Sequence, residues 1–259
     1  MCLRRSSLAA PAVLLGLSLS GLSPGVLAQA SVVNDGQWRY ALGAGASMST
    51  GNTRASSFNV SADAVQVRED AKWALHAQSF YGRSNGRVTA DNLGVNAQRD
   101  QDFNPEWYGY GRGDFLRDKP ANLTYRVSGS SGLGRHLVRD NTHTWDLSSG
   151  LAYTVDSYPG PIKIGGNLRT HYSRVEWVWT QLSTHRVSDT TSLRQRLDFN
   201  TDLRAGGSNR AVFDSGISVA INHSLSLTAS FLLRYNGDPG VGVQKIDTQL
   251  VTGIGLKID

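Results

Sequence analysis

Apolar and polar residues alternate along most of the chain beyond its first thirty positions. In the segment 224–240, SLSLTASFLLRYNGDPG, Leu225 and Leu227 fall on one parity, while Ser226 and Thr228 fall on the other. A period of two turns successive side chains to opposite faces of a β-strand. The segment therefore predicts a strand with one apolar and one polar face.

About twelve segments share this alternation, at 38–48, 57–64, 73–81, 92–98, 108–116, 123–128, 144–154, 174–180, 193–203, 213–222, 225–236 and 245–258. Turn-forming residues separate many of them, at Thr50–Asn52, Ser84–Gly86, Asp118–Asn122, Tyr158–Pro161, Gly206–Asn209 and Gly237–Gly240. Asn, Gly and Pro supply the positive or restricted φ angles of tight turns, so each site predicts a hairpin turn. One strand per roughly 19 residues suits long barrel strands better than the shorter strands of a sandwich.

The aromatic residues indicate which face points inward. The apolar parity carries many alanines and places Trp and Tyr mainly towards strand ends, at Trp38, Tyr40, Trp73, Tyr81, Trp107, Tyr153, Trp179 and Tyr235. Such rings are typical of the interfacial girdles of membrane barrels. We therefore predict an all-β protein, a single antiparallel up-and-down transmembrane β-barrel of about 12 strands whose polar face lines the lumen. A soluble periplasmic β-protein with the apolar face inside is the alternative.

The first thirty residues differ from the rest. MCLRR is basic, residues 8–22 are mostly apolar, and small residues at 26–30 offer cleavage sites. This layout predicts a cleaved signal peptide at 1–30, followed by one barrel domain at 31–259, with a single membrane anchor as the rival interpretation. Cys2 is the sole cysteine, so a disulfide, a thiolate metal site and a cysteine nucleophile are excluded from 31–259.

The formal net charge of the whole chain is +5, from 26 Lys and Arg against 21 Asp and Glu. Arg4 and Arg5 are the only charged residues of the first thirty, so the rest of the chain carries +5 − 2 = +3. No block of five like charges occurs, and a nucleic-acid partner is therefore not expected.

Several short stretches share the pattern of one known family: Arg234, Tyr235, Pro239, Lys245, Asp247, Thr248 and Gly253 near the C-terminus, STGNT at Ser49–Thr53, and Glu176 in RVEW. By these residues the chain resembles the YdiY-like family of salt-induced outer-membrane proteins over essentially its whole length beyond the predicted signal peptide. The resemblance implies a barrel in the outer membrane and, by itself, a link to salt or osmotic stress, but no biochemical activity. One departure is the end Leu256-Lys257-Ile258-Asp259, because such barrels commonly finish with an aromatic residue that the assembly machinery recognises.

Catalytic and metal chemistry finds little support in the sequence. RSNGR at Arg83–Arg87 is similar to a motif of outer-membrane phospholipases, but Gly82 stands where their histidine would be, so we predict a type I′ turn at Asn85-Gly86. No histidine pair has the i, i+2 spacing of a metal site, although His136 and His143 could approach across a hairpin. GLGRH at 132–136 is interpreted as a strand whose glycines relieve crowding. No cofactor, metal or catalytic residue is predicted.

Charged residues on the polar parity are the candidates for function. They are Arg126, Asp146, Arg174, Glu176, Arg194, Arg196, Asp198, Asp214, Arg234, Lys245 and Asp247, all expected at mid-strand, with Asp202 on the same face. In a barrel they either form a constriction that selects solutes by charge or pair with one another and plug the lumen.

The expected function is that of a monomeric, non-enzymatic outer-membrane barrel with a narrow or plugged channel. Its partners would be outer-membrane lipid, the barrel-assembly machinery during insertion, and small ions or solutes. An even strand count would place both termini in the periplasm. The alternative from another class is a lipid hydrolase, which requires a Ser–His pair on the outer face.

Overall fold

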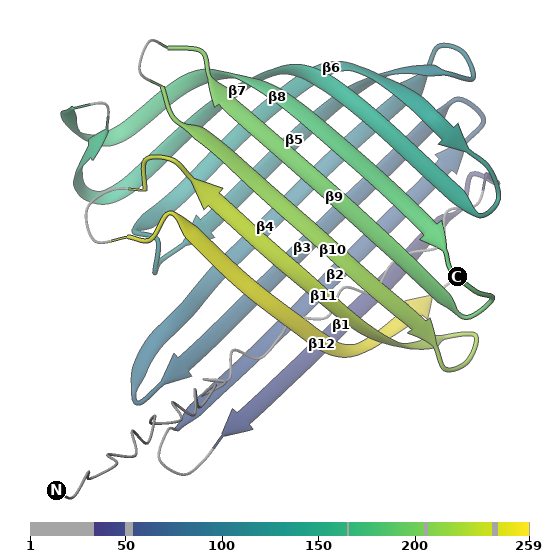
Figure 1. The fold of residues 1–259 in the computed structure, drawn as a ribbon, viewed down its shortest axis with the longest axis horizontal. Helices are drawn as coiled ribbons and strands as arrows, with labels where there is room; N and C mark the ends of the chain where they lie inside the picture. The colour runs from purple at the N-terminus through teal and green to yellow at the C-terminus, as the bar shows by residue number, and fades with distance from the viewer. Residues whose placement is uncertain (1–33, 50–53, 165, 205–206, 240–242, 259) are drawn as a thin grey trace, which may run out of the picture.

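Twelve antiparallel strands close on themselves in the computed structural model (Figure 1). The structure describes residues 34–49, 54–164, 166–204, 207–239 and 243–258. The predicted signal peptide at 1–30, the predicted turn at 50–52 and most of the STGNT segment lie outside these residues. No helix among the described residues is long and apolar enough to cross a membrane.

Each strand pairs with its neighbours in the chain, which is the up-and-down order that the alternation predicts. The strands are β1 (Trp38–Ser49), β2 (Ala55–Arg68), β3 (Ala71–Ser84), β4 (Arg87–Asp102), β5 (Trp107–Asp118), β6 (Leu123–Arg139), β7 (His143–Ile164), β8 (Asn167–Arg186), β9 (Thr191–Asp202), β10 (Asn209–Ala220), β11 (Leu225–Asn236) and β12 (Ile246–Ile258). β1 and β12 close the barrel in a register that runs from Tyr40–Ile258 to Ala44–Ile254. Closure pairs the two strands that would otherwise be edges, and the predicted fold class is confirmed.

The antiparallel order defines two ends of the barrel. The start of β1 and the end of β12 lie at one end, which we call the terminal end, together with the connections at 69–70, 103–106, 140–142, 187–190 and 221–224. The opposite end, the far end, carries the remaining connections, including 119–122 and 237–245.

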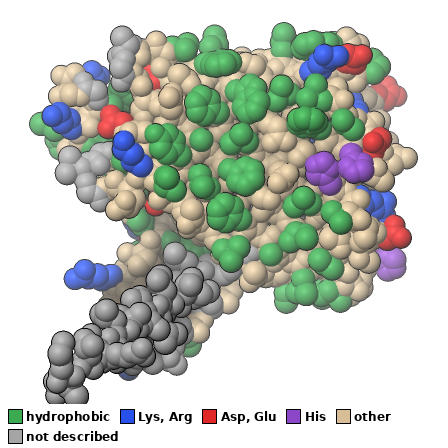
Figure 2. Space-filling model, in the orientation of Figure 1, with side chains coloured by type: hydrophobic (Ala, Val, Ile, Leu, Met, Phe, Trp, Pro, Cys, Tyr) green, Lys and Arg blue, Asp and Glu red, His purple; other side chains and the backbone are tan. Residues whose placement is uncertain are grey.

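The apolar parity faces outward and the polar parity faces the lumen. On β11, Leu227 is 52% exposed, whereas Ser226 and Thr228 are 3% and 6% exposed. Figure 2 shows the same arrangement over the visible face, where hydrophobic side chains cover the middle of the barrel and charged ones gather towards its two ends. A lipid-facing exterior explains this exposure of large apolar side chains, since water would disfavour it.

β5 departs from the predicted pattern. Tyr108 and Tyr110, which the sequence pattern grouped as an apolar face, are 6% and 9% exposed and lie inside the barrel with Arg112 and Asp114. Tyr108 packs so closely on β6 that a Cβ added to Gly134 would lie 2.1 Å from its ring. The interpretation of GLGRH as a strand whose glycines relieve crowding is confirmed, because the missing side chain makes room for the tyrosine.

The predicted turns were partly right. Asn85 and Gly86 have φ angles of 49° and 79°, which confirms the type I′ turn. The turn predicted at Tyr158–Pro161 was wrong, because these residues lie within β7, where the register with β8 shifts between Ser157 and Ile162. Proline lacks a backbone N–H, so it is tolerated at such a bulge as well as in a turn.

Two aromatic residues also lie elsewhere than predicted. Tyr153 and Trp179 are in the middle of β7 and β8, not near strand ends. β7 and β8 have 22 and 20 residues and are the longest strands, so positions that seemed terminal in the short predicted segments are central in the observed strands.

Candidate functional site in the barrel lumen

Two adjoining cavities occupy the lumen. The far cavity, of about 310 Å³, reaches the far end beside Asp238 and Lys245. The terminal cavity, of about 660 Å³, reaches the terminal end beside Thr142 and Ser188. Both are lined by one belt of residues where the two cavities adjoin, which includes His76, Gln98, Arg112, Thr180, Arg196, Asp198 and Arg234. We call these seven residues the central belt.

Paired charges line the lumen at the central belt. Arg196 donates from Nε and Nη2 to Asp198 at 2.7 and 2.8 Å, and Thr180 Oγ1 donates to the same carboxylate at 2.7 Å. Arg112 binds Asp114 in the same two-point manner, at 2.6 to 2.9 Å. Such bidentate pairs hold a guanidinium in one orientation, so the belt presents fixed charges to any solute.

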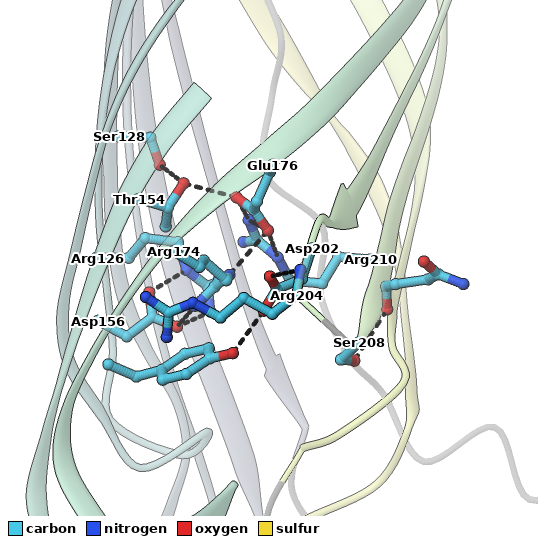
Figure 3. Close-up of polar contacts among 12 residues, drawn as sticks. Arg126, Ser128, Thr154, Asp156, Arg174, Glu176, Asp202, Arg204, Ser208 and Arg210 are labelled. Atoms are coloured by element: carbon cyan, nitrogen blue, oxygen red, sulfur yellow. Dashed lines mark hydrogen bonds and ion pairs between the residues drawn. The ribbon is translucent and has the colours of Figure 1, made fainter. Parts of the chain in front are cut away.

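A larger ion-pair cluster lies on the lumen wall towards the far end (Figure 3). Arg126 donates to both oxygens of Asp156 at 2.6 and 2.7 Å. Arg174 joins Asp156 to Glu176, at 2.9 and 2.8 Å, and Arg210 binds Glu176 at 2.7 Å. We call these five residues the ion-pair cluster; β6, β7, β8 and β10 contribute to it.

The two carboxylates of this cluster are removed from solvent. Glu176 and Asp156 are 0% and 1% exposed, and Thr154 Oγ1 donates a further hydrogen bond to Glu176 at 2.6 Å. Three guanidinium groups share two carboxylates, so the cluster keeps one net positive charge. A buried charge is tolerated only when it is paired and hydrogen-bonded, and every carboxylate oxygen of the cluster has such a partner.

Tyr172 gathers further arginine side chains beside the ion-pair cluster. The guanidinium carbons of Arg174, Arg204 and Arg169 lie 5.2, 5.3 and 5.6 Å from the centre of its ring. Its hydroxyl donates to Asp202 at 2.5 Å. The aromatic face therefore holds three cations near the far end of the lumen by cation–π attraction.

Most of the predicted lumen residues line the two cavities. The far cavity contains Arg126, Lys245 and Asp247, the terminal cavity contains Asp146, Arg194 and Asp214, and Arg196, Asp198 and Arg234 line both. Arg174 and Glu176 are buried in the wall. The expected mid-strand placement was wrong for Lys245, which precedes β12, and for Asp247, the second residue of that strand, because β12 starts later than the alternation suggested.

Several important residues escaped the sequence analysis. Asp156 continues the parity of Thr154, so extending that segment by two residues would have found it. Arg210 is the second residue of β10 and follows the predicted turn at Gly206–Asn209, where no alternation precedes it. Arg112 and Asp114 share their parity with two tyrosines, and the apolar rings concealed a polar face.

The histidines do not assemble a metal site. Among the described residues, no group of three or more His, Cys, Asp and Glu side chains could hold a metal ion. His136 does not approach His143; its Nδ1 and Nε2 lie 2.7 and 3.3 Å from carboxylate oxygens of Asp146 and Asp102. His143 instead neighbours His185, with ring centres 5.3 Å apart.

One Ser–His pair lies on the outward parity of β7 and β8. Ser157 Oγ is 3.3 Å from His171 Nε2, and the other ring nitrogen is 3.2 Å from Thr170 Oγ1. A general base for serine is normally oriented by a carboxylate or an amide, and a hydroxyl is a weak substitute. Ser157 is itself 6% exposed, so the pair is a cross-strand contact more than a reactive site.

The turn between β6 and β7, at the terminal end of the barrel, carries the carboxylate of Asp140. Asp140 accepts hydrogen bonds at 2.7 Å from the backbone N–H groups of Thr142 and His143 and at 2.8 Å from the Thr142 hydroxyl. These hydrogen bonds, with the Thr142 backbone first, lower the pKa of Asp140 to about 2. The terminal end therefore keeps this negative charge in mildly acidic solution.

A closed antiparallel barrel with an apolar exterior and a charged lumen defines a transmembrane β-barrel protein. The chain belongs to the family described as "Protein of unknown function, DUF481", which matches residues 42–258. This family match is consistent with the resemblance noted from the sequence.

The barrel is also similar in fold to solved structures of low sequence identity. The NanC porin gives a TM-score of 0.46 at 10% identity, with 85% of this chain and 99% of that chain covered. The translocator domain of autotransporter NalP from Neisseria meningitidis gives 0.43 at 14% identity, covering 86% and 87%. The beta domain of the Bordetella autotransporter Brka gives 0.41 at 11% identity, covering 85% and 97%. No curated protein matches the chain.

Proposed function

We propose that this protein is a non-enzymatic, monomeric channel of the outer membrane that passes small polar solutes through a narrow charged lumen. The observation that carries the proposal is the pair of cavities that adjoin at the central belt and reach opposite ends of the barrel. A lumen that served only as packing would leave no such space.

The apolar exterior supports a place in lipid, and outer-membrane barrels are the proteins that cross a bilayer with strands alone. The proposed partners are therefore outer-membrane lipid, the barrel-assembly machinery during insertion, and small ions or solutes. A role in salt or osmotic stress is part of the proposal on the strength of the family resemblance only.

The balance of charge supports weak selectivity between cations and anions. Six Lys and Arg side chains and five Asp side chains line the far cavity, and seven of each sign line the terminal cavity. Nearly balanced walls repel neither sign of ion strongly, so we expect passage to depend more on size and on local charge arrangement.

Single-channel conductance of the refolded protein in a planar bilayer tests the proposal. We expect discrete conductance, and we expect Arg196→Gln to shift the reversal potential in a salt gradient towards cation selectivity, because Asp198 would lose its main partner. Arg99→Gln is the matched control, since Arg99 lies on the outer face above the Trp73 ring. A silent protein that is folded and heat-modifiable on a gel would instead favour a plugged structural barrel.

A further inference from the structure

The terminal cavity contains charged groups that lack hydrogen-bond partners. Arg196 forms a bidentate pair with Asp198, but Arg194, two residues earlier on β9, forms no hydrogen bond and no ion pair within 4 Å with any described residue. Asp214 on β10 likewise forms no hydrogen bond and no ion pair within 4 Å with any described residue. A guanidinium has five donors and a carboxylate four acceptor sites, so both groups can bind a solute that enters the cavity.

A third group with unused hydrogen-bonding capacity lies on another wall of this cavity. Asp63 on β2 lies 2.8 Å from His76 Nδ1 through its Oδ1 atom, while its Oδ2 atom is buried and has no hydrogen-bond partner. β2 and β3 are four to six places away from β9 and β10 in the closed order of twelve strands, so the two pairs of strands form facing walls. Arg194, Asp214 and Asp63 all line the terminal cavity.

The residue across from Arg194 is small. Gly216 stands opposite Arg194 in the register of β9 and β10. A Cβ added to Gly216 would make ordinary contact with Ser230 Cβ at 3.5 Å, and the glycine itself has no side chain that could cover Arg194. Ser218 follows on the same face of β10 and offers a hydroxyl to the cavity.

We propose that the terminal cavity binds a small zwitterion, whose carboxylate is held by Arg194 and whose ammonium group lies between Asp63 and Asp214. A guanidinium pairs with a carboxylate through two parallel hydrogen bonds, and an ammonium group donates to carboxylate oxygens. A solute with both groups pairs with Arg194 and with the two carboxylates at once, whereas a simple anion leaves the carboxylates unpartnered and a simple cation leaves Arg194 unpartnered. The inference rests on the proposed function, because such a solute is what the channel would carry.

Ligand-observed NMR on the refolded full chain in detergent tests this site, with glycine as the zwitterion and acetate and methylammonium as its separate halves. We expect glycine to bind more tightly than either half. Arg194→Gln should weaken glycine binding by about tenfold or more, because a charge-assisted bidentate pair is lost. It should also abolish acetate binding and leave methylammonium binding unchanged, and Asp63→Asn should show the opposite pattern.

Arg99→Gln, on the outer face, is the matched control and should bind all three probes as the unchanged protein does. Absence of glycine binding by folded protein, or equal binding in Arg194→Gln, would overturn the inference. The comparison of glycine with its two halves needs no variant, so the test survives a variant that fails to fold. A barrel that conducts but does not bind glycine contradicts this inference alone, and one that binds glycine but is silent contradicts the channel alone.

Discussion

Arg234 Nη1 lies 3.7 Å from Asp118 Oδ2, and this ion pair spans the lumen. Arg234 is on β11 and Asp118 is the last residue of β5, which is six places away in a closed order of twelve strands. The two walls of the barrel therefore meet at this point near the far end. At 24% and 16% exposure and with one long contact, the pair is weaker than the bidentate pairs elsewhere in the lumen.

Asp118→Asn should widen the far end of the channel. Loss of the carboxylate frees Arg234 from the opposite wall, so we expect a higher single-channel conductance at low salt. The difference should shrink as salt approaches 1 M, where the screening length falls to about 3 Å. Asp91→Asn is the control, because Asp91 pairs with Lys119 and Arg117 on the outer parity of β4. Equal conductance of Asp118→Asn and the unchanged protein at every salt concentration would contradict the prediction that the Asp118–Arg234 ion pair restricts the channel.

Glu176→Gln should destabilise the barrel strongly. The variant leaves Arg174 and Arg210 without their shared carboxylate in a fully buried position, and breaking such a pair costs about 3–5 kcal/mol. Urea unfolding in lipid vesicles, followed by tryptophan fluorescence, measures the free energy of unfolding. Glu106→Gln removes a carboxylate from an exposed pair with Arg135, so its cost should stay below about 1 kcal/mol. Similar costs for the two variants would show that the cluster is not a buried network.

Gly134→Ala should also destabilise the protein, through overpacking. The added methyl group would overlap the Tyr108 ring, and a tightly packed interior resists such additions by about 1–3 kcal/mol. Gly129→Ala on the same strand is the control, because no atom lies within 4 Å of the added carbon. The same urea unfolding measurement tests this prediction. A free energy of unfolding equal to that of the unchanged protein would mean that Tyr108 can move away from the added methyl group at little cost.

Asp140 should contribute to stability in a manner that depends on pH. Its pKa in the folded protein, about 2, lies below the ordinary value of 3.8. The carboxylate therefore stabilises the fold above pH 3.8, and this contribution is lost as the pH falls towards 2. The free energy of unfolding of Asp140→Asn, measured from pH 6 to pH 2, should accordingly fall less steeply than that of the unchanged protein. Parallel curves would exclude the turn as a source of acid sensitivity.

Local pattern was sufficient to predict the strands but not their full extent. Leu227 and Thr228 alternate because every second side chain of a strand faces lipid, and this constraint acts within a few residues. The segment 158–161 misled the prediction because its Pro and Gly residues are equally suited to a turn and to a bulge. The choice between the two depends on pairing with β8, which local sequence does not contain.

The sequence by itself determined the number of strands and, on every strand except β5, the lipid-facing parity and the charged face of the lumen. Both follow from a period-two pattern that one strand carries alone, and the up-and-down order was expected because short turns join consecutive strands. The tertiary structure decided which charges meet. Arg126 with Asp156, Glu176 with Arg210, and Asp118 with Arg234 are joined by strand register, shear and barrel closure. The same structure leaves Arg194 without a hydrogen bond or close ion pair among the described residues, although it lies two residues from Arg196 and its bidentate pair with Asp198. Alternation sets which face a residue occupies, whereas its partner depends on distances across the lumen that only the closed barrel defines.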